Sequence, residues 1–189
     1  AGHDVDMDGF TACMEDQKAR ARANAKGDAW GSFNDVWVEL SDKVAATEFD
    51  GYDNDVIEGA KVVAIVRNGE SVESAAAGED VEVVLDRTPF YAESGGQIAD
   101  EGIITADGVH LKVIDVQRPV KGLIAHTVEV VTGGLQTGTS VLAQVDPEWR
   151  LSACQAHSGT HVVHAALRQV LGPSALQSGS YNKPGYLRL

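Results

Sequence analysis

Cysteine is scarce in this sequence, and long apolar runs are missing. The 189 residues include two cysteines, Cys13 and Cys154, which lie far apart and define no disulfide framework. No apolar run approaches the ~18 residues that a membrane-spanning helix needs, and no charged-then-apolar leader opens the chain. We therefore expect a cytoplasmic protein with no membrane partner, while its oligomeric state is left open.

Negative charge is absent from the last part of the chain. The formal net charge of -13 argues against a general nucleic-acid binder, because attraction to phosphate requires clustered lysine and arginine. All 28 acidic residues, however, precede Leu151, whereas Arg168, Lys183, Arg188 and three histidines follow it. This distribution fits a surface that faces phosphate, but three positive charges are few, so a small apolar segment is favoured.

The first 50 residues have the periodicity of helices. In the first predicted helix, Phe10, Cys13, Met14 and Gln17 share one face. A second helix is predicted from about Ser32 to Ala46, where apolar residues recur at spacings of three and four. These residues are Phe33, Val36, Trp37, Leu40 and Val44. We expect them to pack in the core.

From Thr47 the pattern changes to short β-branched runs separated by Gly, Asp and Asn. The predicted strands are Lys61–Arg67, Val81–Arg87, Gly102–Thr105, His110–Val116, Leu123–Val130 and Thr139–Val145. The sequence Arg67-Asn68-Gly69-Glu70 predicts a hairpin turn. Because no helix separates these strands, they predict a small antiparallel barrel or sandwich, and with the flanking helices an α+β fold.

A further helix is predicted after Pro147. Ser152 and Gln155 match a capping box at its start, and Gly172-Pro173 predicts its end. Its apolar residues are expected to form a packing surface. They are Val162, Val163, Ala166, Leu167, Val170 and Leu171.

Two histidines four residues apart, His157 and His161, lie on one face of this helix and can reach a single metal ion. Zinc takes four ligands, or three and a water, so the pair is half of a zinc site. Cys154 lies seven residues before His161, about 10 Å along the axis, so it cannot complete the set and is expected to be buried. A metal-binding pair and a purely structural pair remain equally supported. Ser158 occupies the place of the glutamate base in His-Glu-x-x-His, which disfavours a metalloprotease.

Two polar segments are further candidates for a site. In the loop from Leu85 to Ile98, Ser94 has no neighbouring base, so a structural or docking role is favoured over catalysis. His110 and His126 lie in predicted strands and are expected to be ordinary barrel residues. Gln177-Ser178-Gly179-Ser180 places amide and hydroxyl groups around a glycine, which suits close approach to a ligand carbonyl or ribose.

Three segments together resemble bacterial alanyl-tRNA synthetases. They are the loop Leu85–Gln97, the helix Ala156–Arg168, and Gln177-Ser178-Gly179-Ser180 with its continuation to Leu187-Arg188-Leu189. The resemblance implies that residues 1–50 are the end of a helical tRNA-recognition region. Residues 51–150 would form a β-barrel similar to domain 2 of elongation factor Tu, and residues 151–189 the start of an editing domain.

The same resemblance implies an activity and its site residues. His157 and His161 match the first two zinc ligands of the family, and Gln177 matches a glutamine that lines the editing pocket. The remaining ligands, a Cys-x-x-x-His pair, have no counterpart here, so only half of the zinc site is present. The complete enzyme would use ATP to attach alanine to tRNA(Ala) and would hydrolyse mischarged Ser- and Gly-tRNA(Ala). This chain lacks the ATP-binding core.

Two alternatives stay open at this point. One is a free-standing editing hydrolase of the AlaX type, which shares the barrel-like region and the histidine helix. The other is a connector without activity of its own. Two departures from the family pattern are Ala99, where glycine is usual, and Gly159, where alanine is common. Glycine there costs the helix up to about 1 kcal/mol relative to alanine.

Overall fold

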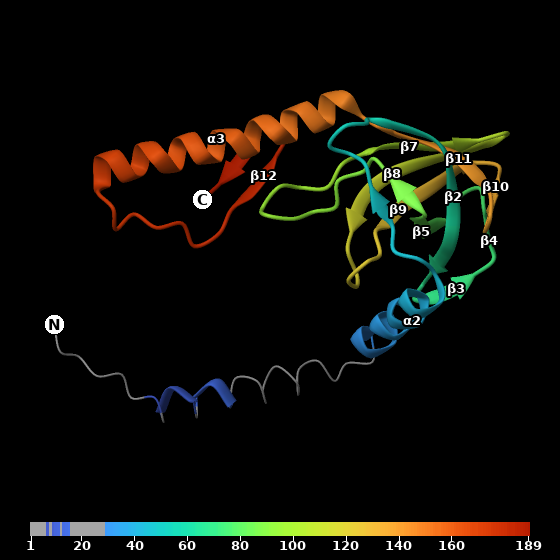
Figure 1. Cartoon of the computed structure of the whole chain (residues 1–189), viewed down its shortest axis with the longest axis horizontal. Coiled ribbons are helices and arrows are strands. Elements are labelled where there is room, and N and C mark those ends of the chain that lie inside the picture. Colours follow the sequence, from blue (N-terminus) through green and yellow to red (C-terminus); the bar gives the residue numbers. More distant parts are fainter. Residues whose placement is uncertain (1–6, 8, 12, 16–28) are drawn as a thin grey trace.

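The computed structural model describes residues 7, 9–11, 13–15 and 29–189. Residues 7, 9–11 and 13–15 are helical, as predicted for this region, and Gln17 lies outside the described residues. Phe10, Cys13 and Met14, which share one face of the first predicted helix, are exposed. A barrel lies on the right of Figure 1, and a long helix extends from it to the left.

The second helix, α2, spans Ala29–Lys43, three residues earlier at each end than predicted. Trp37 and Leu40 are buried against the outside of the barrel, where Val36 and Val44 pack beside them. Their barrel partners are Ala64, Val66, Val84, Leu123 and Ala125. The apolar stripe of α2 therefore has the packing role predicted for it, except that the side chain of Phe33 lies outside the description.

Six antiparallel strands close into a barrel, which decides between the two predicted architectures. They are β2 Val56–Arg67, β5 Asp80–Leu85, β7 Gly102–Ala106, β8 Val109–Gln117, β9 Ala125–Thr132 and β11 Ser140–Val145. Their order is β11-β7-β8-β9-β5-β2, and the pairing of β11 with β2 completes the circle. Closure removes the exposed strand edges that a sandwich would keep. Each of the six predicted strands corresponds to one strand of the barrel.

Alternating side chains of the barrel strands face two different cores. Val83 and Leu85 belong to the interior cluster, whereas Val84 between them faces outward to α2. This is the two-residue period of a β-strand, used here on both faces. The barrel interior is apolar and buried, with Phe90 and Ile104 among its completely buried side chains.

Seven short strands of the described chain lie outside the ring of six, five of them in connections around the barrel and the last two after Leu171. They are β1 Glu48–Phe49, β3 Glu70–Val72, β4 Ser74–Ala76, β6 Arg87–Thr88, β10 Gly134–Gln136, β12 Tyr181–Lys183 and β13 Tyr186–Arg188. The predicted turn between β2 and β3 is confirmed. Arg67 pairs with Glu70 across it, and Asn68 and Gly69 have φ angles of 54° and 80°. Two successive positive φ angles are typical of a type I′ hairpin turn.

Helix α3, Pro147–Leu171, begins five residues before the predicted capping box. Asp146 is the N-cap, and its carboxylate accepts hydrogen bonds from the backbone N–H groups of Glu148 and Trp149 at 2.9 and 3.0 Å. Pro147 occupies the first turn, where the missing N–H costs nothing. Ser152 therefore lies inside the helix, and the predicted cap was wrong. The predicted end at Gly172 is confirmed.

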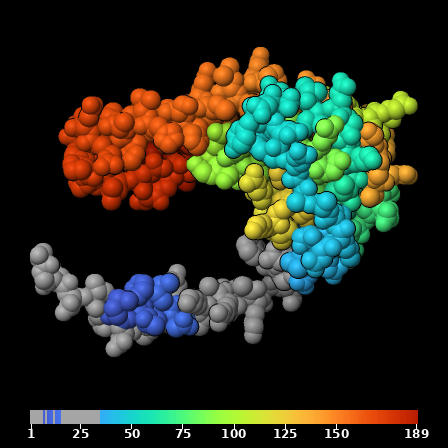
Figure 2. All heavy atoms as spheres, viewed as in Figure 1, coloured from blue at the N-terminus to red at the C-terminus, as the bar shows by residue number. Residues whose placement is uncertain are grey.

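The predicted packing surface of α3 is also wrong for this chain. Only Ala153 and Thr160 of the helix are buried, while Val162 and Val170 are 70% and 82% exposed. The helix projects from the barrel and is accompanied by the β12–β13 hairpin, with which it forms a separate lobe (Figure 2). The apolar residues from Val162 onward consequently face solvent.

Candidate functional site on helix α3

His157 and His161 lie one turn apart on α3, and their rings meet. The two Nε2 atoms are 3.2 Å apart, and the ring centroids are separated by 5.1 Å at an interplanar angle of 53°. One Nε2–H can be donated to the other Nε2, so only one of these two nitrogens carries a proton in the neutral pair. The sequence spacing predicted this convergence, because residues i and i+4 share a helix face.

The geometry of this pair fits half of a zinc site. Two nitrogen ligands at about 2.0–2.1 Å from a tetrahedral zinc ion lie about 3.3 Å apart, close to the separation of the two Nε2 atoms. Among the described residues, the Nδ1 atom of His157 is buried and has no hydrogen-bond partner. A zinc-bound imidazole normally donates its second N–H to an oxygen acceptor. Within the described part of the chain, no group of three His, Cys, Asp or Glu side chains could hold a metal ion.

Cys154 is exposed, contrary to our expectation of a buried residue. The buried face of α3 carries Ala153 and Thr160, which are seven residues apart and therefore aligned, and Cys154 is rotated away from that face. Cys154 contributes to the wall of a cavity of about 340 Å³ at the junction between helix and barrel. The other lining residues are Phe49, Gly51, Tyr52, Tyr91, Gln97 and Arg150.

Gln177 lies in the segment that connects α3 to β12, and it is exposed. This segment returns alongside the helix (Figure 1), where the Nε2 atom of His164 approaches the carbonyl oxygen of Ala175 at 3.3 Å. The return of the chain places Gln177 on the lobe that carries the histidine pair. In the described part of the chain, Gln177 forms no hydrogen bond with either imidazole. Its role in a pocket stays a prediction.

The hairpin formed by β12 and β13 is held between α3 and the loop predicted to have a docking role. The hydroxyl of Thr160 donates to Asn182 Oδ1 at 2.5 Å, and both residues are buried. The backbone N–H of Asn182 donates to the carbonyl of Gly96 at 2.6 Å, and that of Ile98 donates to the carbonyl of Asn182 at 2.9 Å. The loop therefore docks the hairpin, which agrees with the prediction. Ser94 is exposed in the same loop.

Arg150, in the first turn of α3, fixes the helix to the barrel. Its Nε donates to both carboxylate oxygens of Asp100 at 3.0 Å, and its two terminal nitrogens donate to the carbonyls of Gly51 at 2.7 Å and Pro89 at 2.6 Å. Burial alone would lower the pKa of Arg150, but the hydrogen bond and charge of Asp100 outweigh it and raise the pKa. Arg150 stays charged and binds three chain segments at once.

Sequence reasoning missed Arg150, Asp100, Thr160 and Asn182. The contacts that give them their role join residues 22 to 99 positions apart, Thr160 with Asn182 and Arg150 with Gly51 at the two extremes, and no motif of local spacing encodes them. A lone arginine after a predicted barrel is also common on any protein surface. The sequence offered one indication, because Asp100 follows a loop that is rich in polar residues. It did not indicate which residue Asp100 would bind.

His126 is an ordinary barrel residue, as predicted. It is completely buried, its Nδ1 lies 2.8 Å from the carbonyl oxygen of Val83, and its Nε2 lies 2.7 Å from the hydroxyl of Thr88. Nδ1 must be the donor, since a carbonyl only accepts, so Nε2 accepts the hydroxyl proton. Burial lowers the pKa of His126 to about 4, against a smaller opposing effect of the Val83 hydrogen bond. His110 is half-buried in β8.

Comparison with known proteins places these features in a family. The family of class II (A) tRNA synthetases matches residues 1–149. The chain belongs to this family of tRNA synthetases. Over its whole length it is 53% identical to the alanine–tRNA ligase of Nocardia farcinica and 52% identical to that of Paenarthrobacter aurescens. Over 99% of its length it is 51% identical to the alanine–tRNA ligase of Cutibacterium acnes.

The chain spans about a fifth of the length of these relatives, 21% in each case. Its similarity to alanine–tRNA ligases agrees with the resemblance found in the sequence, and it favours a synthetase over a free-standing AlaX-type hydrolase. Among the described residues, no helix has both the length and the apolar character that crossing a membrane requires.

Proposed function

We propose that this chain is the part of an alanine–tRNA ligase that joins a tRNA-recognition region to an editing site, and that His157 and His161 supply two ligands of a zinc ion in that site. The contact between their Nε2 atoms, at 3.2 Å, carries the proposal, because it presents two imidazole nitrogens at the separation that zinc requires. The similarity to alanine–tRNA ligases over the whole chain supports the assignment to editing.

Editing is needed because the aminoacylation pocket discriminates poorly between alanine and the similar amino acids glycine and serine. A missing methyl group or an added hydroxyl changes binding by only about 1–3 kcal/mol, so glycine and serine are attached in error. A second, hydrolytic site removes them from tRNA(Ala). When bound, zinc would supply a Lewis acid that polarises the ester or activates water. His157 and His161 would hold the metal, and the amide of Gln177 would orient the substrate through hydrogen bonds. ATP would be bound elsewhere in the complete enzyme.

The structure of the barrel supports a positioning role for the chain itself. Arg150 ties the first turn of α3 to three connecting segments around the barrel, and α2 packs on the outer wall of the barrel. A rigid barrel between two helical elements sets the distance between the regions that they belong to. Taken alone, the chain is therefore expected to act as a connector in the cytoplasm, with tRNA(Ala) as the partner of the complete protein.

The proposal is tested in the full-length protein with the variants His157→Gln and His161→Gln. We expect each to lose zinc, measured by elemental mass spectrometry, and to lose release of serine from Ser-tRNA(Ala), while ATP-dependent attachment of alanine continues. His164→Gln is the matched control, because His164 lies on the same helix but contacts the carbonyl of Ala175 instead of the pair. Normal zinc content and normal editing in both pair variants would refute the proposal.

The 189-residue chain is expected to bind zinc weakly and to deacylate poorly, since two ligands leave the metal half-coordinated. Zinc titration followed by competition with a chelator measures this affinity. Stoichiometric binding at nanomolar concentration, together with efficient release of serine, would contradict a half-site and would mean that the chain completes the coordination by itself.

A further inference from the structure

The β12–β13 hairpin has two chemically different faces. Across the strands Tyr181 pairs with Arg188, Asn182 with Leu187, and Lys183 with Tyr186. Residues directly opposite each other share a face, and neighbours along a strand alternate between faces. Asn182 and Leu187 therefore lie on one face, and the two tyrosines and the two cations lie together on the other.

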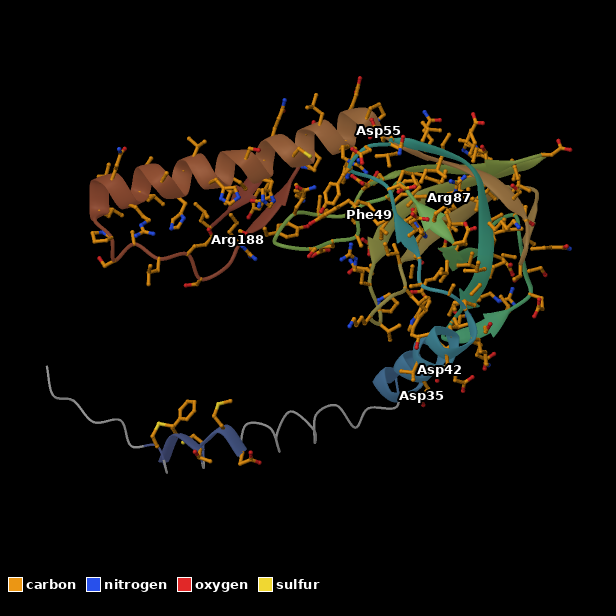
Figure 3. All side chains as sticks on the ribbon, viewed as in Figure 1. Asp35, Asp42, Phe49, Asp55, Arg87 and Arg188 are labelled. Carbon is orange, nitrogen blue, oxygen red and sulfur yellow. The ribbon has the colours of Figure 1, made fainter. Side chains whose placement is uncertain are left out.

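The Asn182–Leu187 face is the one that packs on α3. Asn182 accepts the hydrogen bond of Thr160, and Leu187 Cδ2 lies 3.6 Å from the position that a Cβ would occupy on Gly159. The opposite face, formed by Tyr181, Lys183, Tyr186 and Arg188 and here called the tyrosine–cation face, is consequently turned away from the helix. Figure 3 shows Arg188 on the hairpin, at the side away from α3.

In the tyrosine–cation face each tyrosine lies opposite a cation on the partner strand. The rings of Tyr181 and Tyr186 meet edge to face with centroids 6.2 Å apart. Arg188 lies 5.9 Å from the centroid of Tyr181, and Lys183 Nζ lies 5.7 Å from that of Tyr186. These distances are within the range of cation–π contact, with Arg188 over the ring of Tyr181 and Lys183 over the ring of Tyr186. Tyr186 is still 46% exposed, so its ring keeps free surface.

We propose that the tyrosine–cation face is a binding site for single-stranded RNA. Exposed aromatic rings stack on bases of any sequence, and adjacent cations bind the phosphates between them. The electrostatic setting agrees, because no carboxylate side chain occurs from Leu151 to Leu189, whereas all 28 acidic residues precede that segment. In duplex RNA the base faces are already stacked on one another, so they cannot stack on the two tyrosine rings.

Given the proposed editing function, the RNA at this face would be the unpaired 3′ end of the tRNA, which carries the amino acid. Thr160 holds the hairpin and lies between His157 and His161 in the sequence of α3. A strand bound on the hairpin is therefore anchored to the same turns of the helix as the histidine pair. The identity of this RNA depends on the proposed function, but binding of single strands to the hairpin does not.

The first experiment measures fluorescence anisotropy of a labelled single-stranded RNA oligonucleotide titrated with the 189-residue chain. Tyr186→Leu is expected to weaken binding about tenfold, and Tyr186→Phe to restore it, since the phenyl ring keeps its stacking face. Arg188→Gln is expected to weaken binding and to reduce the slope of log affinity against log salt by about 0.7. Tyr52→Leu and Arg118→Gln make the same chemical changes at exposed barrel positions and should bind like the unmodified chain.

Unchanged affinity in Tyr186→Leu overturns the inference. The inference is also overturned if duplex RNA binds as tightly as the single strand, or if an acidic peptide competes as well as the single strand. Either result would mean that binding depends on charge alone and not on base stacking. In the full-length protein, Tyr186→Leu should raise the KM for Ser-tRNA(Ala) about tenfold and leave kcat unchanged. If the hairpin binds RNA but the protein releases no serine, the proposed function fails and the RNA site stands. If the protein releases serine and the hairpin variants bind RNA like the unmodified chain, the RNA site fails and the proposed function stands.

Discussion

Arg150 and Asp100 form an ion pair between the first turn of α3 and the loop that precedes β7, with the carboxylate completely buried and the guanidinium side chain 16% exposed. Asp100 is also bound by the backbone N–H of Tyr91 at 2.6 Å. The pair is therefore part of a network that joins helix, loop and barrel. It decides where α3, and with it the histidine pair, leaves the barrel.

Replacing Arg150 by Met leaves the buried carboxylate of Asp100 without its countercharge. Loss of one partner of a buried pair costs about 3–5 kcal/mol, so we expect the free energy of unfolding to fall by about 3 kcal/mol in urea titrations. Arg118→Met, on the exposed barrel surface, should change it by less than about 0.5 kcal/mol. In a double-mutant cycle with Asp100→Asn, purely additive effects would show that the two residues are not coupled.

Gly96 is the glycine of the docking loop that lies against the hairpin. A Cβ at this position would lie 2.7 Å from the carbonyl oxygen of Ser180, and the backbone has a φ angle of +82°. Gly96→Ala should destabilise the docked hairpin by more than the roughly 1–2 kcal/mol of the left-handed conformation. Gly95→Ala is the control, since its φ is +61° and an added Cβ would meet no atom of the described, non-neighbouring residues within 4 Å. Hydrogen exchange of the Asn182 amide should accelerate in the first variant, and equal effects in both would argue against the contact with Ser180.

Gly159 lies inside α3, where alanine is the better helix former. An added Cβ would meet Leu187 Cδ2 at 3.6 Å, an ordinary van der Waals distance. Gly159→Ala should therefore raise the free energy of unfolding by up to about 1 kcal/mol, seen as a higher Tm. Ser158→Ala, at the exposed neighbouring position, should give a smaller gain. A lower Tm for Gly159→Ala would mean that the hairpin packs more tightly on the helix than the structure shows.

The buried imidazole of His126 should make stability depend on pH. Its pKa is about 4 in the folded protein, against 6.5 for an ordinary histidine, so between these values the unfolded chain binds a proton that the native barrel does not. The contribution of the neutral imidazole to the free energy of unfolding is fully present above pH 6.5. It falls as the pH falls toward 4, by about 3 kcal/mol in total.

Urea titrations across this range measure the loss for the unmodified chain and for two variants. His126→Asn keeps a donor near Val83 and should flatten the dependence, although it lowers stability at neutral pH. His110→Gln should preserve the dependence, because His110 is half-buried elsewhere in the barrel. An NMR titration that shows His126 protonated at pH 6 would contradict the assignment.

The sequence by itself determined the local elements. The strands were readable because β-branched residues alternate with a period of two, and the turn at Asn68-Gly69 because both residues tolerate positive φ. The convergence of His157 and His161 follows from helix geometry alone, since a spacing of four residues is about one turn. The motif residues also identified the family, because they recur in the same order along almost the whole chain.

Tertiary structure decided what depends on residues far apart in the chain. Closure of the barrel required β11 to pair with β2, which is about 80 residues earlier, and no local pattern encodes that choice. Asp146 displaced Ser152 as the helix cap because the end of β11 delivers the chain there. The sequence also did not predict the exposure of Val162 and Val170, since an apolar periodic face is buried only where a partner surface exists. Arg150 gained its role from three segments that only folding brings within reach of one guanidinium.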